Sequence, residues 1–350
     1  MPNVKISAAA DPGALLGTDM VPLARAGQAT AYRTTMTEVA TFASASAAAG
    51  LNNIGRNLLH NAYFMVRQRG IGAFTANGLT LDRWQTAFVN GTVSVAQVQL
   101  TDANRTAIGD EAAQQALNYQ FTGSATAGSF HQLHQHLENV HLLAGKTVSV
   151  SFWAAASAAL TISVNLYQAF GTGGSPSAQV VLAAQNCAIT TAWGTRYSAT
   201  FTLPSVSGKT LGTNGDDFTG LFFTMSDPAS IGAQSGSVSF WGVQLEIGSV
   251  ATQLEKLDAS ITNAQCQRFY QGGFARLDAY GAAGSQISVT IPYVVPMRGV
   301  PTLNRNDSGN VNMSSASITS FGAWGLLFLG TINATGGASL TTNWTASADL

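Results

Sequence analysis

The chain has 350 residues, only 9% of them charged, and a formal net charge of −1. Soluble domains usually contain about 25% charged residues, so small polar residues and glycine replace charge in much of this sequence. Without a basic excess there is no field to hold a phosphate backbone, which argues against nucleic-acid binding. No stretch reaches about 18 uninterrupted apolar residues, so no membrane insertion is expected. The first residues lack the basic start and apolar core of a signal peptide.

The two cysteines, Cys187 and Cys266, lie far apart in the sequence and fit no metal-ligand spacing. We expect them to be buried, reduced thiols. A chain with so few charges also suggests that copies of itself cover part of its surface.

Residues 1–50 form a first small unit. Short strands are expected over 20–23 and 31–34, followed by a helix over 36–49. Thr35 can cap that helix, and Glu38 follows three residues later. A unit of this size cannot bury a core alone, so we expect a partner or trimerisation to complete it.

Residues 57–256 form the large domain, which opens with an expected strand, a glycine-rich loop and a second strand over 57–85. Trp84, Trp153 and Trp241 are expected in strands, with their rings in the core. Further strands are expected over 91–100, 116–121, 130–140, 146–154, 160–170, 180–187, 196–203, 218–225 and 237–245. About ten strands separated by Gly, Pro, Asn and Asp predict a two-sheet β-sandwich or jelly roll.

Residues 258–350 begin with an expected helix over 258–270, which Ser260 or Thr262 could cap. Strands are expected over 286–292, 293–296, 316–318 and 325–332. The last stretch, 336–350, is small and polar apart from Leu340 and Trp344, and is assigned no strand.

Several segments of the chain are similar in sequence to one known group of proteins. They include NLLHNAYFMVRQRG (57–70), LTLDRW (79–84), LAGKTVSVSFWAAAS (143–157), AQCQRFYQ (264–271) and VPMRGVPTL (295–303). These segments, in this order, resemble bacteriophage tail-fibre, spike and related virion proteins. Val66 departs from the pattern, because the family often has an aromatic residue there.

The resemblance implies a mainly β fibre or spike protein that assembles as a homotrimer. It implies an N-terminal virion-attachment bead (1–50), a carbohydrate-binding-module-like jelly roll (57–256), and a linking helix with a C-terminal β tip domain (258–350). The implied location is the virion, on a tail or head fibre, after synthesis in the host cytoplasm. Residues 1–50 would bind other virion proteins.

The function implied by the resemblance is adhesion to host surface glycans by non-covalent binding, with no enzyme activity and no cofactor. One alternative is a purely structural head-fibre, decoration or connector protein. A second alternative is a polysaccharide depolymerase.

Histidines cluster in FHQLHQHLENVH. On a strand, His134 and His136 would share one face, and His141 would point the other way. Two such residues could contribute to a metal site, which needs further ligands. The favoured interpretation is that they are polar residues facing solvent or a trimer interface.

Two acidic pairs, Asp216–Asp217 and Asp110–Glu111, could carry other chemistry. Glycoside cleavage needs two carboxyl groups about 5–9 Å apart, one with a raised pKa. The family pattern instead places Asp216 and Asp217 in a turn that leads into a strand. Their carboxylates could also bind a structural Ca²⁺ with backbone oxygens.

Three aromatic residues, Tyr280, Trp324 and Trp344, lie among Gly- and Ala-rich turns near the C-terminal end. An exposed ring there could stack on a sugar, with nearby Asn or Asp side chains forming hydrogen bonds. The competing interpretation is that the trimer buries these rings.

Overall fold

The structure is a computed structural model that describes residues 20–23, 32–35 and 55–350, and it separates into the units 1–54 and 55–350. In the first unit, β1 (Met20–Leu23) pairs antiparallel with β2 (Tyr32–Thr35). This confirms the two short strands predicted there. The helix predicted over 36–49 lies outside the described residues.

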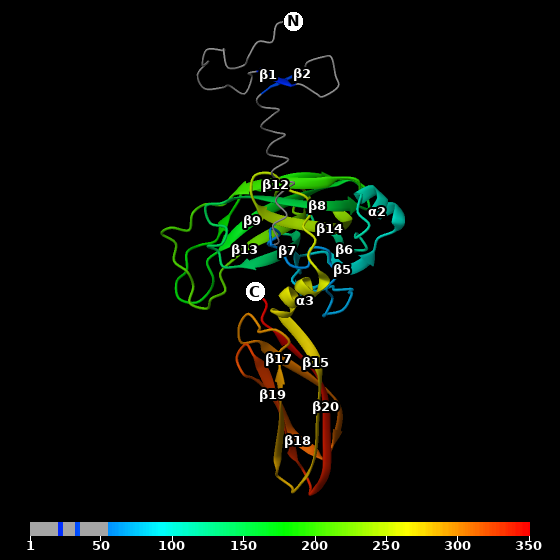
Figure 1. The fold of residues 1–350 in the computed structure, drawn as a ribbon, viewed down its shortest axis with the longest axis vertical. Coiled ribbons are helices and arrows are strands. Elements are labelled where there is room, and N and C mark those ends of the chain that lie inside the picture. The colour runs from blue at the N-terminus through cyan, green and yellow to red at the C-terminus, as the bar shows by residue number, and fades with distance from the viewer. Residues whose placement is uncertain (1–19, 24–31, 36–54) are drawn as a thin grey trace. The chain divides into compact units, whose positions relative to one another are not determined.

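Residues 55–256 contain two antiparallel sheets (Figure 1). The first has the order β10-β9-β13-β7-β4-β3, with β11 also pairing with β9, and the second has the order β12-β8-β14-β6-β5. The strands of the first sheet are β3 (Gly78–Leu79), β4 (Gln85–Val89), β7 (Phe130–Glu138), β9 (Leu160–Ala169), β10 (Val180–Val181), β11 (Gln185–Ile189) and β13 (Phe218–Ser226). Those of the second are β5 (Thr92–Gln99), β6 (Gln115–Thr122), β8 (Thr147–Ala156), β12 (Arg196–Thr202) and β14 (Ser235–Ile247). The predicted sandwich is confirmed, and the strand predicted over 180–187 is divided between β10 and β11.

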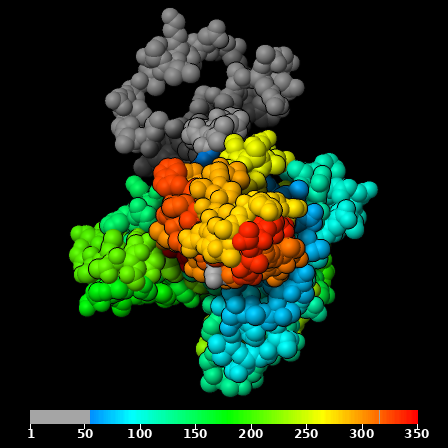
Figure 2. All heavy atoms as spheres, turned by 90° about the horizontal axis from the view of Figure 1, so that it is seen from below, coloured from blue at the N-terminus to red at the C-terminus, as the bar shows by residue number. Residues whose placement is uncertain are grey.

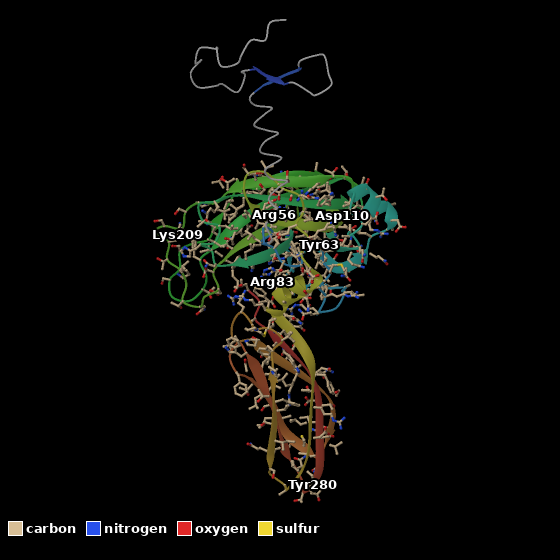
Figure 3. All side chains as sticks on the ribbon, viewed as in Figure 1. Arg56, Tyr63, Arg83, Asp110, Lys209 and Tyr280 are labelled. Carbon is tan, nitrogen blue, oxygen red and sulfur yellow. The ribbon has the colours of Figure 1, made fainter. Side chains whose placement is uncertain are left out.

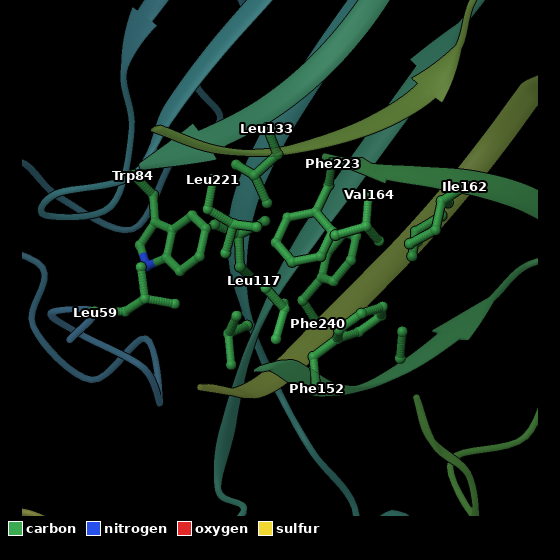
Figure 4. Close-up of a cluster of buried hydrophobic side chains, with 14 of the residues drawn as sticks. Leu59, Trp84, Leu117, Leu133, Phe152, Ile162, Val164, Leu221, Phe223 and Phe240 are labelled. Carbon is green, nitrogen blue, oxygen red and sulfur yellow. The ribbon is translucent and has the colours of Figure 1, made fainter. Parts of the chain in front are cut away.

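The side chains between the two sheets form one large apolar core (Figure 4). Phe223 of the first sheet packs against Phe152 and Phe240 of the second, with ring centroids 4.9 and 5.0 Å apart. Trp84 joins them at 6.4 Å from Phe223 and is fully buried. Burying each such side chain contributes about 1.5–3 kcal/mol.

A smaller apolar cluster lies against the opposite face of the second sheet. Trp241 is fully buried there and contacts the partly buried Trp153 at 5.2 Å between ring centroids. The cluster includes Ile108 of α2 (Asp102–Ile108), a helix that the sequence analysis does not predict. Thr101 caps α2 by accepting a hydrogen bond from the Asn104 backbone.

The strand predicted at the start of the large domain is wrong, because residues 57–70 are irregular although many of their side chains are buried. Asparagine side chains replace the missing strand partner. The Asn57 Oδ1 accepts from the backbone of Leu59 and of Leu245, and the Asn61 amide bonds both backbone groups of Val66. Buried backbone groups need such partners. Trp84 is also outside a strand, at the residue before β4.

The linking helix α3 spans Ala259–Gln267. Its cap is Asp258, whose side chain accepts from the Ser260 backbone at 2.8 Å, so neither Ser260 nor Thr262 is the cap. None of the helices in the described part of the chain has the length and hydropathy needed to cross a bilayer.

The C-terminal β domain consists of two three-stranded antiparallel sheets around a separate apolar core. The strands of one sheet, in spatial order, are β15 (Tyr270–Gly281), β20 (Gly336–Ser347) and β17 (Thr302–Val311); those of the other are β16 (Gln286–Pro292), β19 (Gly325–Ile332) and β18 (Met313–Ser320). The strands predicted over 286–292 and 325–332 are confirmed, and 316–318 lies within β18. The strand predicted over 293–296 is wrong, and β20 occupies a stretch that was assigned no strand.

Candidate functional site

One face of the first sandwich sheet points away from the core and carries aromatic and amide side chains. In β9, β13 and β7 the core-facing residues are Val164, Leu221 and Leu133, among others. Because side chains alternate along a strand, their neighbours project from the opposite face. The register places Asn165, Phe222, His134 and Gln85 in one row across four strands on that outer face.

Five rings from this row and the next two stack on one another, and we call them the aromatic ladder: Tyr167, Phe222, His134, His136 and Phe218. The centroid distances along it are 4.0 Å from Tyr167 to Phe222, 4.8 Å to His134, 4.9 Å to His136 and 3.7 Å to Phe218. The predicted shared face of His134 and His136 is confirmed. The ladder is longer than this pair, because β13 and β9 contribute three further rings.

The ladder is electrically neutral near pH 7. Burial lowers the pKa of His134 from 6.5 to about 3, and the neighbouring His136 lowers it further. Burial also lowers the pKa of His136 to about 4, although its contact with the Leu350 carbonyl opposes the shift. Of the two predicted environments, solvent or a trimer interface, His134 does not have the first in the protomer, because the Phe222 ring of the adjacent strand buries it.

A metal site at His134 and His136 has no third ligand in the described part of the chain. No group of three or more His, Cys, Asp or Glu side chains with suitable geometry occurs among those residues. The two imidazoles instead stack face to face, with an interplanar angle of 28°.

Two buried polar atoms on this face lack a partner in the described chain: the Asn165 Oδ1 and the His134 Nδ1. Phe222 lies between them, since it is the register partner of both residues. An unsatisfied buried polar group costs about 1–3 kcal/mol, so such groups are uncommon without a reason. Neither atom is accessible to solvent, so a ligand could reach them only if the surrounding rings moved.

One side of the ladder is bounded by the last residues of the chain. The Gln85 Nε2 donates to the Leu350 carbonyl at 2.7 Å, and the His136 Nδ1 lies 3.3 Å from the same oxygen. Gln85 belongs to β4 and His136 to β7. The other side of the ladder, at Tyr167 on β9, is half-buried and makes no such contact in the described chain. A ligand would therefore approach from the β9 side.

The acidic pairs are held by hydrogen bonds and ion pairs. Asp216 accepts hydrogen bonds from the backbone and hydroxyl of Thr172, and these bonds lower its pKa. Asp217 accepts from the Val140 backbone at 2.8 Å. Asp110 pairs with Lys256, and Glu111 with Arg105. A general acid needs a raised pKa, so the shift at Asp216 has the opposite direction to that required.

The three aromatic candidates for sugar stacking are not brought together. Tyr280 is 84% exposed near one end of the C-terminal β domain, where Figure 3 labels it, and Trp324 is 71% exposed. Tyr280 precedes Gly281, which lies beside Ile332 at the end of β19, whereas Trp324 precedes the start of β19. The eight residues of β19 separate these positions by about 23 Å. Trp344 is only 6% exposed, in the core beside Tyr293, so its ring cannot stack on a sugar.

A groove of about 490 Å³ lies between the irregular segment 63–68 and the start of α3. Its lining is mainly apolar: Tyr63, Met65, Val66, Arg67, Gln68, Leu257, Ala259, Thr262 and Asn263. The sequence analysis does not identify it, because its two walls are almost 200 residues apart in the chain.

The sequence analysis also misses Asn165, Tyr167 and Phe222. The signal that could have identified them is the alternation in TISVNLYQ, where Asn165 and Tyr167 share the face opposite the apolar Val164 and Leu166. Their position beside His134 depends on the strand order, which the sequence does not reveal.

The described residues of 55–350 thus form a protein built from two successive antiparallel β domains, with a face of stacked aromatic rings on the larger one. No protein-family model matches the chain, and no curated protein matches it. Among solved structures, the enzymatically active domain of tailspike protein 4 from bacteriophage CBA120 has 13% identity and a TM-score of 0.33; the match covers 57% of this chain and 23% of that one. A CBM4 structure has 16% identity and a TM-score of 0.30, over 54% of this chain and 98% of that one.

A family 11 carbohydrate-binding module from Clostridium thermocellum, in complex with a β-1,3-1,4-mixed-linked tetrasaccharide, has 12% identity and a TM-score of 0.30. That match covers 52% of this chain and 100% of the module. Similarities at these scores do not assign a function to the present chain.

Proposed function

We propose that this chain is a fibre or spike subunit of a bacteriophage or phage-like particle, and that it adheres to host surface glycans by non-covalent binding. The observation that carries the binding role is the aromatic ladder, whose half-buried Tyr167 ring lies at the β9 side, on the same face as Asn165. The sequence resemblance given above supports the fibre role.

The chemistry of the ladder favours an uncharged sugar. Sugar-binding sites combine a flat apolar surface with a few directional polar groups. Here the half-buried Tyr167 ring supplies the surface, with Phe222 packed against it at 4.0 Å between ring centroids, and Asn165 is the neighbouring polar side chain. Because both histidines are neutral near pH 7, the ladder offers no cation to an acidic sugar.

A single site of this kind binds weakly, and assembly would raise the overall affinity. We infer a homotrimer, held to other virion proteins through residues 1–50. Linked weak sites can exceed the affinity of one site by about 10²–10⁴-fold without any new contact.

The test is isothermal titration of the full chain with neutral oligosaccharides prepared from the host envelope. Tyr167→Ala and Asn165→Ala should each weaken binding about 10-fold, which corresponds to about 1.4 kcal/mol. Tyr280→Ala is the matched control, because it removes an exposed ring that is remote from the ladder. The site is refuted if both ladder variants bind like the parent protein while Tyr280→Ala loses binding.

The same titrations separate the alternatives. Two results together would identify a structural virion protein. The protein would bind no host glycan, and particles that carry its Tyr167→Ala variant would adsorb normally. New reducing ends after long incubation with the polysaccharide would show a depolymerase instead.

A further inference from the structure

The outer face of the sheet β16-β19-β18 in the C-terminal β domain has leucines at its centre. Leu326 and Phe328 of β19 are buried in the core, so Leu327 and Leu329 project from the opposite face. The register places Thr290 and Thr319 on either side of Leu327. Ser288 and Ser317 flank Leu329 in the same way.

This leucine face, defined by Leu327, Leu329 and their four flanking hydroxyl residues, has no charge. None of the strands β16, β18 and β19 contains Asp, Glu, Lys, Arg or His. The opposite face of the domain differs, since Arg276 and Asp278 of β15 project there, 59% and 54% exposed, and pair with each other. Figure 2 shows the surface of the C-terminal β domain in yellow to red.

A cluster of exposed apolar side chains lies at one end of the same sheet. Val294, Phe321 and Trp324 are each more than half exposed. The Tyr293 backbone donates to the Trp324 carbonyl at 2.9 Å, and the Phe321 backbone donates to Gly325 at 2.7 Å. These bonds hold the cluster at the end of the sheet where β19 begins.

We propose that the leucine face, together with this end cluster, is the surface through which copies of the chain associate. The inference deepens the homotrimer of the proposed function by naming the surface that forms it. A partner copy buries a neutral face without desolvating a charge, whereas burying the opposite face would desolvate the Arg276–Asp278 pair. A glycan fits the leucine face poorly, because the one aromatic ring in these three strands, Phe328, points into the core.

The area of the surface indicates how the copies must meet. Three strands of about seven residues cover about 330 Å², from a 3.3 Å rise per residue and a 4.8 Å strand spacing. A stable two-body contact buries about 800 Å² on each partner. The sheet alone is too small for such a contact, so the exposed side chains of the end cluster must also be buried. In a closed ring each copy makes two contacts, one with each neighbouring copy.

The first experiment measures the mass of the full chain by light scattering over a range of concentrations. The parent protein should run as a multiple of 36.3 kDa, and Leu329→Glu should shift to the protomer mass, with association weakened about 100-fold or more. Asn343→Glu is the matched control and should leave the mass unchanged. Asn343 is exposed on the other face of the domain, where it is the register partner of Phe274.

A second experiment remains decisive if Leu329→Glu fails to fold. Ser317→Cys, treated with a short bis-maleimide at low protein concentration, should give covalent oligomers, and Asn343→Cys should not. The native thiols do not interfere, because Cys187 and Cys266 are buried. A monomeric parent protein, or equal cross-linking of both variants, would overturn the proposal.

The same variant separates this proposal from the glycan site. Leu329→Glu should bind a monovalent oligosaccharide with the parent affinity per protomer, and lose only the gain from several linked sites. Loss of oligomerisation with intact binding per protomer supports the leucine face. If the parent protein is an oligomer that Leu329→Glu dissociates, but neither protein binds glycan, the leucine face is supported and the proposed ladder site is contradicted.

Discussion

Replacing His134 by phenylalanine should make the protein less sensitive to acid. Burial lowers the folded-state pKa of His134 from 6.5 to about 3. Above pH 6.5 this residue is neutral in both the folded and the unfolded state, so its titration costs no stability there. As the pH falls from 6.5 towards 3, the unfolded chain binds a proton that the folded protein excludes. pH 5 lies about 1.5 units below the pKa of the unfolded-state histidine. Protonation of the unfolded chain therefore lowers the free energy of unfolding by about 2 kcal/mol.

Phenylalanine keeps the ring but removes the titratable group. The ring can still stack between Phe222, at 4.8 Å, and His136, at 4.9 Å. No hydrogen bond of the His134 Nδ1 is lost, because this atom has no partner in the described chain. At pH 7 we therefore expect His134→Phe to be as stable as the parent protein or more stable, since an unsatisfied buried polar group is removed.

The assay is urea unfolding at pH 7 and at pH 5, followed by tryptophan fluorescence. The parent protein should lose about 2 kcal/mol more than His134→Phe between the two pH values. His141→Gln is the control, because His141 is exposed, and it should follow the parent. Equal losses in the parent and in His134→Phe would refute the conclusion that the ladder holds His134 neutral.

Two further predictions concern stability. Arg83→Met should lower the free energy of unfolding by about 3–5 kcal/mol, because it removes one partner of a buried ion pair with Asp349, whereas the exposed Arg276→Met should leave urea midpoints unchanged. Gly91→Ala should lower the free energy of unfolding by about 2–4 kcal/mol, since its φ is +80° and a Cβ would lie 1.9 Å from a backbone oxygen. The control Gly109→Ala, with φ +77° and open space around it, should lower it by only about 1 kcal/mol. Equal destabilisation of the two variants in thermal unfolding would contradict this prediction.

The strands that could be predicted are those in which local pattern and tertiary environment agree. β16 and β19 begin and end where the apolar alternation predicts, because one face of each strand packs on the core. β20 was missed because its core-facing positions, such as Ala338 and Thr342, are small or polar and give a weak pattern. The irregular segment that begins at Asn57 was mistaken for a strand, since a sequence does not show that asparagine amides will replace the strand partner.

The candidate site could be predicted only within single strands. The spacing of His134 and His136 is enough to place both side chains on one face. Their burial comes from Phe218 and Phe222, which are about 80 residues away, and from a strand order in which β13 lies between β7 and β9. The neutral state of the histidines follows from that burial, so it could not be derived from the local sequence.

Six charged side chains form ion pairs where the C-terminal β domain meets the sandwich. Arg69 and Arg83 both pair with Asp349, and Arg268 and Arg298 both pair with Glu138. The guanidinium of Arg83, labelled in Figure 3, also lies 3.4 Å above the ring centroid of Phe269.

Ion pairs in a partly buried junction have a fixed geometry and are difficult to replace singly, because removing one partner leaves the other uncompensated. Glu138 lies beside Phe218 at one end of the aromatic ladder, whereas the strands of the leucine face contain no charged residue. A neutral face is desolvated at low cost, which suits a contact with an uncharged sugar or with a second copy better than it suits ionic attraction. Binding at either face should therefore depend little on salt, whereas unfolding of the junction should depend on it more strongly.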